Sequence, residues 1–311
     1  MKIVVTGALG HIGSRVIREF AKTYPDSEIV LIDNLLTQRY SSLFDLPSTA
    51  KYRFVEGDVL ELDLVPCIKS ATVVLHLAAI TDATSSFGNR EQVEYVNYNA
   101  TVKVADACLR AGTPMIHLSS TSVYGTQNEV VDEDCSEEEL KPQSPYAETK
   151  LKEEEYLQKL GGEGLAFVTC RFGTIYGTSV GMRFHTAVNK FCWQAVMKQP
   201  ISVWRTALHQ KRPYLDLDDA VAAFKFIIDK KLFDRRIYNV LTTNATVNDV
   251  VEMISSHIPD VSIEYVDTPI MNQLSYEVAN KHFKNQGFKF NGDLKDGIFL
   301  TIKLLKNSNI T

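Results

Sequence analysis

The chain has 311 residues, of which 45% are hydrophobic and 23% are charged, and its formal net charge is -5 at pH 7. This length can bury a large core, either as one α/β unit or as two lobes of unequal size. No basic stripe is present to meet a phosphate backbone, so nucleic acid is not an expected partner. No apolar run approaches the ~18 residues that a membrane span requires, so no membrane partner is expected either.

The N-terminal residues and the cysteines indicate the compartment. The sequence MKIVVTGALG runs directly into a predicted strand and turn, without the charged leader and apolar segment of a secretion signal. The cysteines are odd in number and scattered, with no C-x-x-C spacing for a metal or redox pair. We therefore expect a cytoplasmic protein with reduced thiols and no bound metal. The five cysteines are Cys67, Cys108, Cys135, Cys170 and Cys192.

Short β-branched runs alternate with helical patterns over the first half of the chain. This alternation is typical of an α/β fold in which helices cover both faces of a parallel sheet. Ser144 and Pro145 resemble an N-cap and a first helical residue, and Gly112 and Gly161 resemble C-terminal stops. The predicted strands are residues 2–6, 28–32, 52–56, 72–77, 114–118 and 165–171. The predicted helices are residues 11–24, 93–111 and 146–160.

The regular alternation fails after Arg171, where glycines mark a loop-rich stretch and a smaller lobe is expected to begin. A helix is predicted over 214–229 and a strand over 237–240, so the chain should return to the first lobe before completing the second. Residues 125–143 are polar and acidic and are expected to form a loop over the sheet edge. The first domain is predicted to be 1–175 with a return segment at about 212–241. The second is predicted to be 176–211 and 242–311.

A glycine turn follows the first predicted strand. Gly7, Gly10 and Gly13 permit a sharp bend, a close approach of backbone N–H groups to a pyrophosphate, and tight packing of the next helix. By themselves they are weak evidence, because an ordinary turn has the same pattern. Twenty residues further on, Asp33 ends the second strand, where a carboxylate accepts hydrogen bonds from a ribose diol and repels a 2′-phosphate. Together these features favour NAD over NADP, and they make the first domain the cofactor-binding one.

Tyr146 and Lys150 lie four residues apart on a predicted helix, so both project from one face. A neighbouring ammonium favours the phenolate of a tyrosine whose ordinary pKa is ~10. Taken alone, this spacing more often describes a surface pair. The hydroxyl-rich run 119–125 favours a functional pair over a surface pair. It ends the fifth predicted strand, and ligands of open parallel sheets bind at that edge.

These motifs, together with His76-Leu77-Ala78-Ala79 and Asn97-x-x-x-Thr101 in this order, give the chain a family resemblance. It resembles the extended short-chain dehydrogenase/reductase family, and more closely the nucleotide-sugar epimerase/dehydratase branch. The resemblance covers nearly the whole chain and is densest before Tyr176. It implies a Rossmann-type doubly wound parallel sheet, a smaller C-terminal substrate-binding lobe, and NAD as cofactor.

The resemblance also implies roles for individual residues. Tyr146 would be the general acid/base, Lys150 would hold the nicotinamide ribose and tune Tyr146, and Ser120 would bind the reacting sugar hydroxyl. The implied cofactor-binding residues are Gly7, Gly10, His11, Ile12, Gly13, Asp33, Asn34, Asp58, Val59, Leu77, Ala78, Ala79, Asn97, Tyr146 and Lys150. The implied substrate-binding residues are Thr81, Ser120, Thr121, Thr174, Arg183, His185 and Arg212.

Arg212 lies in a segment similar to the one whose arginine contacts the substrate diphosphate in this branch. Two departures leave the nucleotide open. Gly173-Thr174 stands where an asparagine is usual, and residues 269–273 stand where an Arg-Pro-Gly-Asp-like segment is expected. Trp193 and Trp204 have the chemistry to stack on a base, although a tryptophan in an apolar stretch more often belongs to the core.

The residues beside the catalytic serine bear on the reaction. Members of the branch that act as 4,6-dehydratases carry an acidic residue there, whereas this chain has Thr121 and Ser122. The resemblance therefore favours an epimerase that acts on a nucleotide-diphosphate sugar through a keto intermediate. A ketosugar reductase using NAD(P)H, a dehydrogenase of a small hydroxy or amino acid, and a catalytically silent dinucleotide sensor remain alternatives. The family also implies a homodimer formed through the helices predicted at 93–111 and 146–160.

Overall fold

The computed structural model describes residues 1–81, 85–127, 130–266 and 275–306. Its main feature is a seven-stranded sheet in the order β11-β7-β5-β4-β1-β2-β3, in which every neighbouring pair is parallel. The order reverses between β1 and β4, and open parallel sheets bind ligands beyond the carboxyl ends of the strands at such a point. The strands are β1 (Lys2–Thr6), β2 (Glu28–Asp33), β3 (Lys51–Glu56), β4 (Val73–His76), β5 (Met115–Ser120), β7 (Phe167–Phe172) and β11 (Ile237–Val240).

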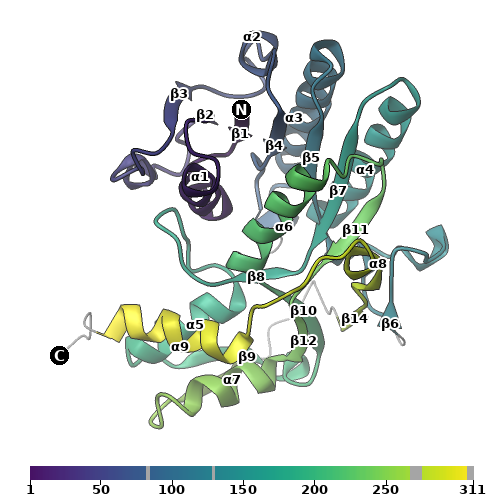
Figure 1. Ribbon diagram of the computed structural model, residues 1–311. Helices are drawn as coiled ribbons and strands as arrows, with labels where there is room; N and C mark the ends of the chain where they lie inside the picture. The colour runs from purple at the N-terminus through teal and green to yellow at the C-terminus, as the bar shows by residue number, and fades with distance from the viewer. Residues whose placement is uncertain (82–84, 128–129, 267–274, 307–311) are drawn as a thin grey trace.

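Helices cover both faces of this sheet because its strands are apolar on both sides (Figure 1). In β1, Ile3 and Val5 pack into the core beneath α1 and α6, whereas Val4 packs into the core beneath α3 and α4. All three side chains are fully buried. The helices of the two faces are α1 (His11–Thr23), α6 (Leu217–Lys230), α2 (Val65–Ile68), α3 (Arg90–Ala111) and α4 (Pro145–Gly162).

A second group of elements lies below the main sheet in Figure 1 and has its own apolar core. Its three-stranded sheet has the order β12-β10-β8, and two further pairs, β13 with β9 and β14 with β6, are parallel. The strands are β6 (Val130–Val131), β8 (Thr174–Tyr176), β9 (Ile201–Trp204), β10 (Lys211–Asp216), β12 (Thr243–Thr246), β13 (Ile263–Val266) and β14 (Glu277–Val278). The helices of this group are α5 (Ala187–Val196), α7 (Val247–Ser255) and α9 (Leu294–Leu305). The short helix α8 (Lys281–Asn285) lies with the main sheet, because its Phe283 packs into the core beneath α1 and α6.

The α/β prediction is confirmed. All seven predicted strands lie in the main sheet, and the three helices predicted in the first half lie within three residues of their predicted bounds. The loop predicted over 125–143 contains the short strand β6. Among the described residues, no helix is long and apolar enough to cross a membrane.

The helix predicted to begin at 214 begins instead at Leu217, so its predicted start is wrong. Tyr214, Leu215 and Asp216 extend β10 and pair with β8. The Asp216 carboxylate then accepts a hydrogen bond from the Asp218 N–H at 2.7 Å and caps the new helix. The two-domain division remains a prediction. Its return segment of about 212–241 holds most of β10, which pairs in the three-stranded sheet, as well as α6 and β11, which lie with the main sheet.

Candidate active site

A cavity of about 450 Å³ opens beyond the carboxyl ends of β1, β2, β4 and β5. It collects residues that are far apart in the sequence, from Gly7 to Tyr276. Of the sequence-predicted cofactor, catalytic and substrate residues, every one except Asn97 lines it. Those residues are Gly7, Gly10, His11, Ile12, Gly13, Asp33, Asn34, Asp58, Val59, Leu77, Ala78, Ala79, Thr81, Ser120, Thr121, Tyr146, Lys150, Thr174, Arg183, His185 and Arg212.

The glycine turn leaves no space for side chains. A Cβ on Gly7, whose φ is +64°, would lie 2.7 Å from the Ala78 backbone nitrogen, and a Cβ on Gly13 would lie 2.4 Å from the Gly7 carbonyl oxygen. α1 begins directly after this turn with Gly10 as its N-cap, so no side chain covers its first N–H groups. A backbone that closely approaches the cavity and an open helix N-terminus fit a pyrophosphate, and thus a dinucleotide.

Asp33 fixes the turn from the end of β2. Its Oδ2 accepts the Leu9 N–H at 3.0 Å and its Oδ1 accepts the Leu35 N–H at 3.0 Å. The next residue, Asn34, donates to Asp58 Oδ2 at 3.0 Å, so two carboxylates and an amide meet at one end of the cavity. Hydrogen-bond acceptors at this place fit the ribose and base of an adenosine that carries no 2′-phosphate.

Asn97 is the predicted cofactor residue that lies outside the cavity lining. It is buried on α3, where its Oδ1 accepts the Ile80 N–H at 2.7 Å and its Nδ2 donates to the Ile80 carbonyl at 2.9 Å. Both ends of the amide are occupied by backbone. Asn97 thus holds the segment after β4, whose Leu77, Ala78 and Ala79 line the cavity.

Three catalytic candidates converge from β5 and α4. Ser120 is the last residue of β5, and its Oγ accepts the Ser122 hydroxyl at 2.9 Å. Tyr146 and Lys150 lie on the first turns of α4, which starts where predicted because Ser144 Oγ accepts the Ala147 N–H at 3.2 Å. The Lys150 ammonium lies 5.8 Å from the centre of the Tyr146 ring.

The surroundings of Tyr146 act on its acidity in opposite directions. Burial raises the pKa of its phenol, the Lys150 ammonium lowers it, and the Glu153 carboxylate raises it again; the pKa lies above its ordinary value. The pKa of Lys150 is also raised, because Glu153 and Tyr146 together outweigh the effect of burial. Without a bound cofactor, Tyr146 is therefore a protonated hydroxyl at neutral pH, and the Lys150 ammonium beside it is charged.

Cations line the cavity although the whole protein is acidic. Arg39, Arg183 and Arg212 all line it. Burial and the nearby Arg183 lower the pKa of Arg39 to about 10, which leaves it charged at neutral pH. Burial, with His185 and the two arginines Arg39 and Arg183, lowers the pKa of His11 to about 3, so this imidazole is neutral. This cluster fits anionic ligands.

Arg39 and Tyr276 are among the lining residues that sequence reasoning missed. Tyr276 directly precedes β14, which pairs with β6, a strand more than a hundred residues earlier in the chain. No local sequence pattern therefore marks Tyr276 as a cavity residue. Its hydroxyl lies 3.3 Å from Thr121 Oγ1. Arg39 follows Asp33 by six residues, and a basic residue shortly after the acidic strand end is the signal that could have identified it.

The two tryptophans considered for base stacking lie away from the cavity. Trp193 packs against Phe184 with ring centroids 5.0 Å apart and lies against the apolar core of the second group of elements, as the core alternative predicts. Trp204 lies in β9, and neither tryptophan lines the cavity. Residues 269–273, where the branch usually has an arginine, lie outside the described residues.

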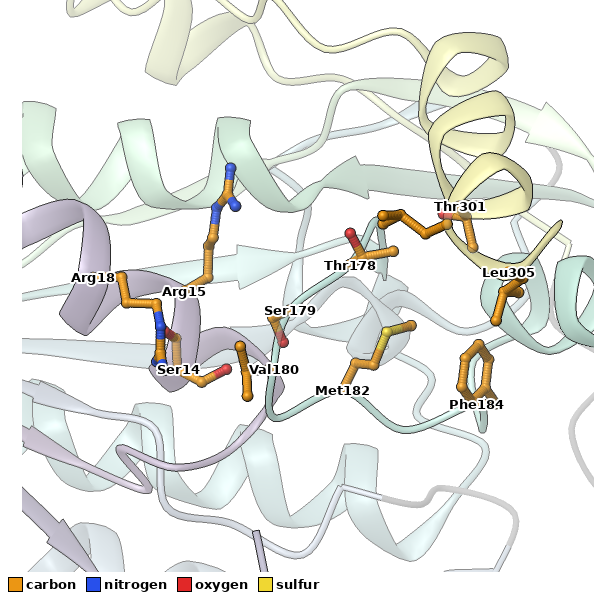
Figure 2. Close-up of a pocket in the computed structure, with 11 residues that line it drawn as sticks. Ser14, Arg15, Arg18, Thr178, Ser179, Val180, Met182, Phe184, Thr301 and Leu305 are labelled. Carbon is orange, nitrogen blue, oxygen red and sulfur yellow. The ribbon is translucent and has the colours of Figure 1, made fainter. Parts of the chain in front are cut away.

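A second hollow, of about 340 Å³, lies between α1, the loop after β8, and α9. Figure 2 shows the side chains that line it. Its two arginines are engaged by the fold. Arg15 Nη2 lies 2.7 Å from Asp218 Oδ1, and Arg18 donates to the Phe44 carbonyl at 2.6 Å. Figure 2 shows the Arg15 guanidinium directed away from Met182. The candidate active site is accordingly the larger cavity.

Comparisons with known proteins agree with this geometry. The model of the NAD dependent epimerase/dehydratase family matches residues 3–240. The chain is 29% identical, over 97% of its length, to a trifunctional UDP-glucose 4,6-dehydratase/UDP-4-keto-6-deoxy-D-glucose 3,5-epimerase/UDP-4-keto-L-rhamnose-reductase of Arabidopsis thaliana. It covers 46% of that protein, so the chain spans about half the length of this plant relative.

Two further similar proteins match most of this chain and most of their own length. An uncharacterized UDP-glucose epimerase of Bacillus subtilis is 29% identical over 74% of this chain and 73% of its own length. The solved structure of MoeE5 in complex with UDP-glucuronic acid and NAD superposes with a TM-score of 0.86 at 26% identity. That likeness covers 99% of this chain and 100% of the MoeE5 chain.

Proposed function

The chain belongs to the NAD-dependent epimerase/dehydratase family, and from this premise we propose that it epimerises one carbon of a nucleotide-diphosphate sugar. The observation that carries the proposal is the set of Ser120, Tyr146 and Lys150 in a cavity that also holds the glycine turn. The intact set opposes the alternative of a catalytically silent dinucleotide sensor, because a sensor has no need of it.

NAD is the cofactor of this family, and the residues of the cavity fit it. Gly7, Gly10 and Gly13 would hold its pyrophosphate at the N-terminus of α1, and Asp33 would hold the adenosine ribose. Lys150 would hold the nicotinamide ribose. Bound NAD supplies reversible hydride acceptance at the sugar carbon.

The protein residues handle the proton. Tyr146 must act as the phenolate, which the Lys150 ammonium favours and which the positive nicotinamide of bound NAD⁺ would favour further. The phenolate Oη would take the proton of a sugar hydroxyl and become the phenol, while Ser120 Oγ donates a hydrogen bond to the same oxygen. After the ketosugar turns its other face to the cofactor, Tyr146 would return the proton, so the protein ends the cycle in its starting state.

The distribution of carboxylates supports epimerisation over 4,6-dehydration. Dehydration needs an acid at the sugar C6 hydroxyl and a base at C5. Among the described residues that line the cavity, the carboxylates are Asp33 and Asp58, and both lie at the adenosine end. The hydroxyl of Thr121, beside the serine, donates a hydrogen bond to the Phe172 carbonyl at 3.2 Å and lies 3.3 Å from the Tyr276 hydroxyl. A ketosugar reductase would use the same three residues for half of the cycle and is the second candidate.

The substrate side of the cavity supports a diphosphate. Arg212 belongs to β10 and lines the cavity, as does Arg183, whose Nη2 donates to Thr81 Oγ1 at 2.9 Å. We assign the substrate diphosphate to Arg212, and the sugar to the side chains of Thr81, Thr174, Arg183 and His185. A dehydrogenase of a small hydroxy acid would have no use for this many cations.

A panel of nucleotide sugars tests the proposal. We expect isomerisation of at least one UDP-, dTDP-, GDP- or CDP-sugar without net consumption of NADH, with UDP-glucose and UDP-glucuronic acid tested first. Tyr146→Phe should lower turnover by about 10²- to 10⁴-fold because it removes the acid/base. Products are separated by chromatography with and without added NADH. Stoichiometric loss of NADH would select the reductase, and loss of water from the sugar would select a dehydratase.

We further propose that the chain forms a homodimer through α3 and α4. These two helices pack against each other on one face of the sheet and leave their outer surfaces uncovered. Tyr95 lies on this outer surface of α3 with 65% of its area exposed, and tyrosine is a residue type enriched at the centres of protein–protein contacts. A second copy of α3 and α4 would cover it.

A further inference from the structure

A fully buried carboxylate lies beneath the catalytic lysine. Glu153 Oε2 lies 2.8 Å from Lys150 Nζ, 2.8 Å from His117 Nε2, and accepts the Thr101 hydroxyl at 3.0 Å. The exposed fraction of Glu153 is 0%. Its other oxygen, Oε1, is buried without a hydrogen-bond partner among the described residues. Three donors from α4, β5 and α3 therefore converge on one oxygen.

The protonation states of this cluster follow from its contacts. Burial by itself would raise the pKa of Glu153, but Lys150 and His117 outweigh it and the pKa is lowered, so the carboxylate is charged. Burial lowers the pKa of His117, so its imidazole is neutral. Because the charged carboxylate has no proton to give, the neutral imidazole carries its hydrogen on Nε2 and donates it to Glu153.

The charged and titratable groups around Tyr146 come from four elements, which are α4, β4, β5 and β7. Lys150, Glu153 and Glu154 share α4 with it, and the pKa of each imidazole facing the cluster, His117 on β5 and His76 on β4, is lowered by burial. Glu154 is paired with Arg171 of β7, with Oε2 2.7 Å from Nη2. The pair of Lys150 and Glu153 is therefore close to neutral as seen from Tyr146.

We propose that Glu153, held by His117 and Thr101, is a positioning residue that fixes the Lys150 ammonium and sets the pH at which the Tyr146–Lys150 pair releases its first proton. With Glu153 charged, the cluster of Tyr146, Lys150 and Glu153 has no net charge, and loss of a proton leaves it negative. Without that charge the cluster is positive, and the same loss leaves it neutral. Removing the carboxylate thus makes the first proton easier to release, whichever of the two groups supplies it.

The test is a titration that needs no substrate. The protein is labelled with [¹³Cζ]tyrosine and [¹⁵Nζ]lysine, and the NMR signals of Tyr146 and Lys150 are assigned with Tyr146→Phe and Lys150→Met. The first midpoint of the pair is then measured with and without NAD. We expect Glu153→Gln to move this midpoint to lower pH. Glu155→Gln, the same change on the exposed side of α4, should titrate as the unaltered protein does.

A second variant makes the prediction independent of the first. Thr101→Val keeps the shape of the side chain but removes one hydrogen-bond donor from Glu153. The negative charge of Glu153 then acts more strongly on Tyr146 and Lys150, so the first midpoint of the pair should move to higher pH. Unchanged midpoints in Glu153→Gln, or in Thr101→Val where Glu153→Gln does not fold, would overturn the proposal, because a merely structural carboxylate would change stability alone. The proposal rests on the proposed function only for the role of Tyr146, and the titration succeeds or fails whether or not the chain epimerises a sugar.

Discussion

At the scale of single residues, several polar side chains are buried in states fixed by their neighbours. Thr6 Oγ1 accepts the backbone N–H groups of Leu77 and Ala78 at 3.2 and 3.3 Å, so its hydrogen points to His76 Nδ1, 2.8 Å away. His76 is therefore held as a neutral imidazole, and burial lowers its pKa to about 3. Ordinary local spacing does not reveal such a state, because the partners come from β1 and from the segment after β4.

His76 makes stability depend on pH. Because its folded pKa is depressed below the ~6.5 of an unfolded histidine, the unfolded chain binds one more proton between these values, and stability falls as pH decreases through this window by ~1.4 kcal/mol per pH unit. The free energy of unfolding of His76→Asn is measured with urea between pH 7 and pH 5. With decreasing pH it should fall less steeply than that of the unaltered protein, by ~1.4 kcal/mol per pH unit. His209→Asn, on the surface, is the control. Parallel curves for His76→Asn and the unaltered protein would show that His76 does not contribute.

At the scale of elements, helix starts and close contacts decide where the site residues lie. The predicted start of α4 is confirmed because its signal is local: Ser144 caps the helix and Pro145 is its first residue. The predicted start of α6 is wrong because the apolar run from Tyr214 is shared between a strand and a helix. Only the pairing of β10 with β8 and the cap at Asp216 separate the two.

Two helical glycines should respond oppositely to the same substitution. In Gly13→Ala the new Cβ would meet the backbone oxygen of Gly7 at 2.4 Å, so we expect a loss of ~1–3 kcal/mol in stability and weaker NAD binding. Gly162, at the end of α4, has nothing within 4 Å of a new Cβ, and Gly162→Ala should gain up to ~1 kcal/mol. Denaturation and NAD titration of both variants check this. A stable Gly13→Ala with full NAD affinity would contradict the role of the tight turn.

At the scale of the whole molecule, the cavity is assembled from both sheets. The main sheet contributes the glycine turn and the ends of β2, β4 and β5, whereas β8 and β10 contribute Thr174 and Arg212. The substrate side therefore depends on how the second group of elements packs on the first. The relatives from Arabidopsis thaliana and Bacillus subtilis carry names for different reactions, as is expected where one fold holds different substrate sites.

The homodimer proposal concerns the outer surface of α3 and α4. We expect sedimentation equilibrium to give twice the mass of one chain. Tyr95→Glu should yield the monomer because it places a charge in an apolar contact, while Tyr40→Glu, on another exposed aromatic residue, should leave the dimer intact. A monomeric unaltered protein, or a Tyr95→Glu dimer, would reject the proposed contact.

The sequence by itself determined the α/β fold, the glycine turn, Asp33 and the spacing of Tyr146 and Lys150. Each depends on a local rule: strand and helix periodicity, the steric need for glycine, or two residues on one helix face. Only the tertiary structure placed Arg39 and Tyr276 in the cavity. It also turned Asn97 onto the Ile80 backbone and brought Glu153, His117 and Thr101 together beneath Lys150. These contacts join three or more elements, and their register depends on how the whole core packs rather than on any short stretch of chain.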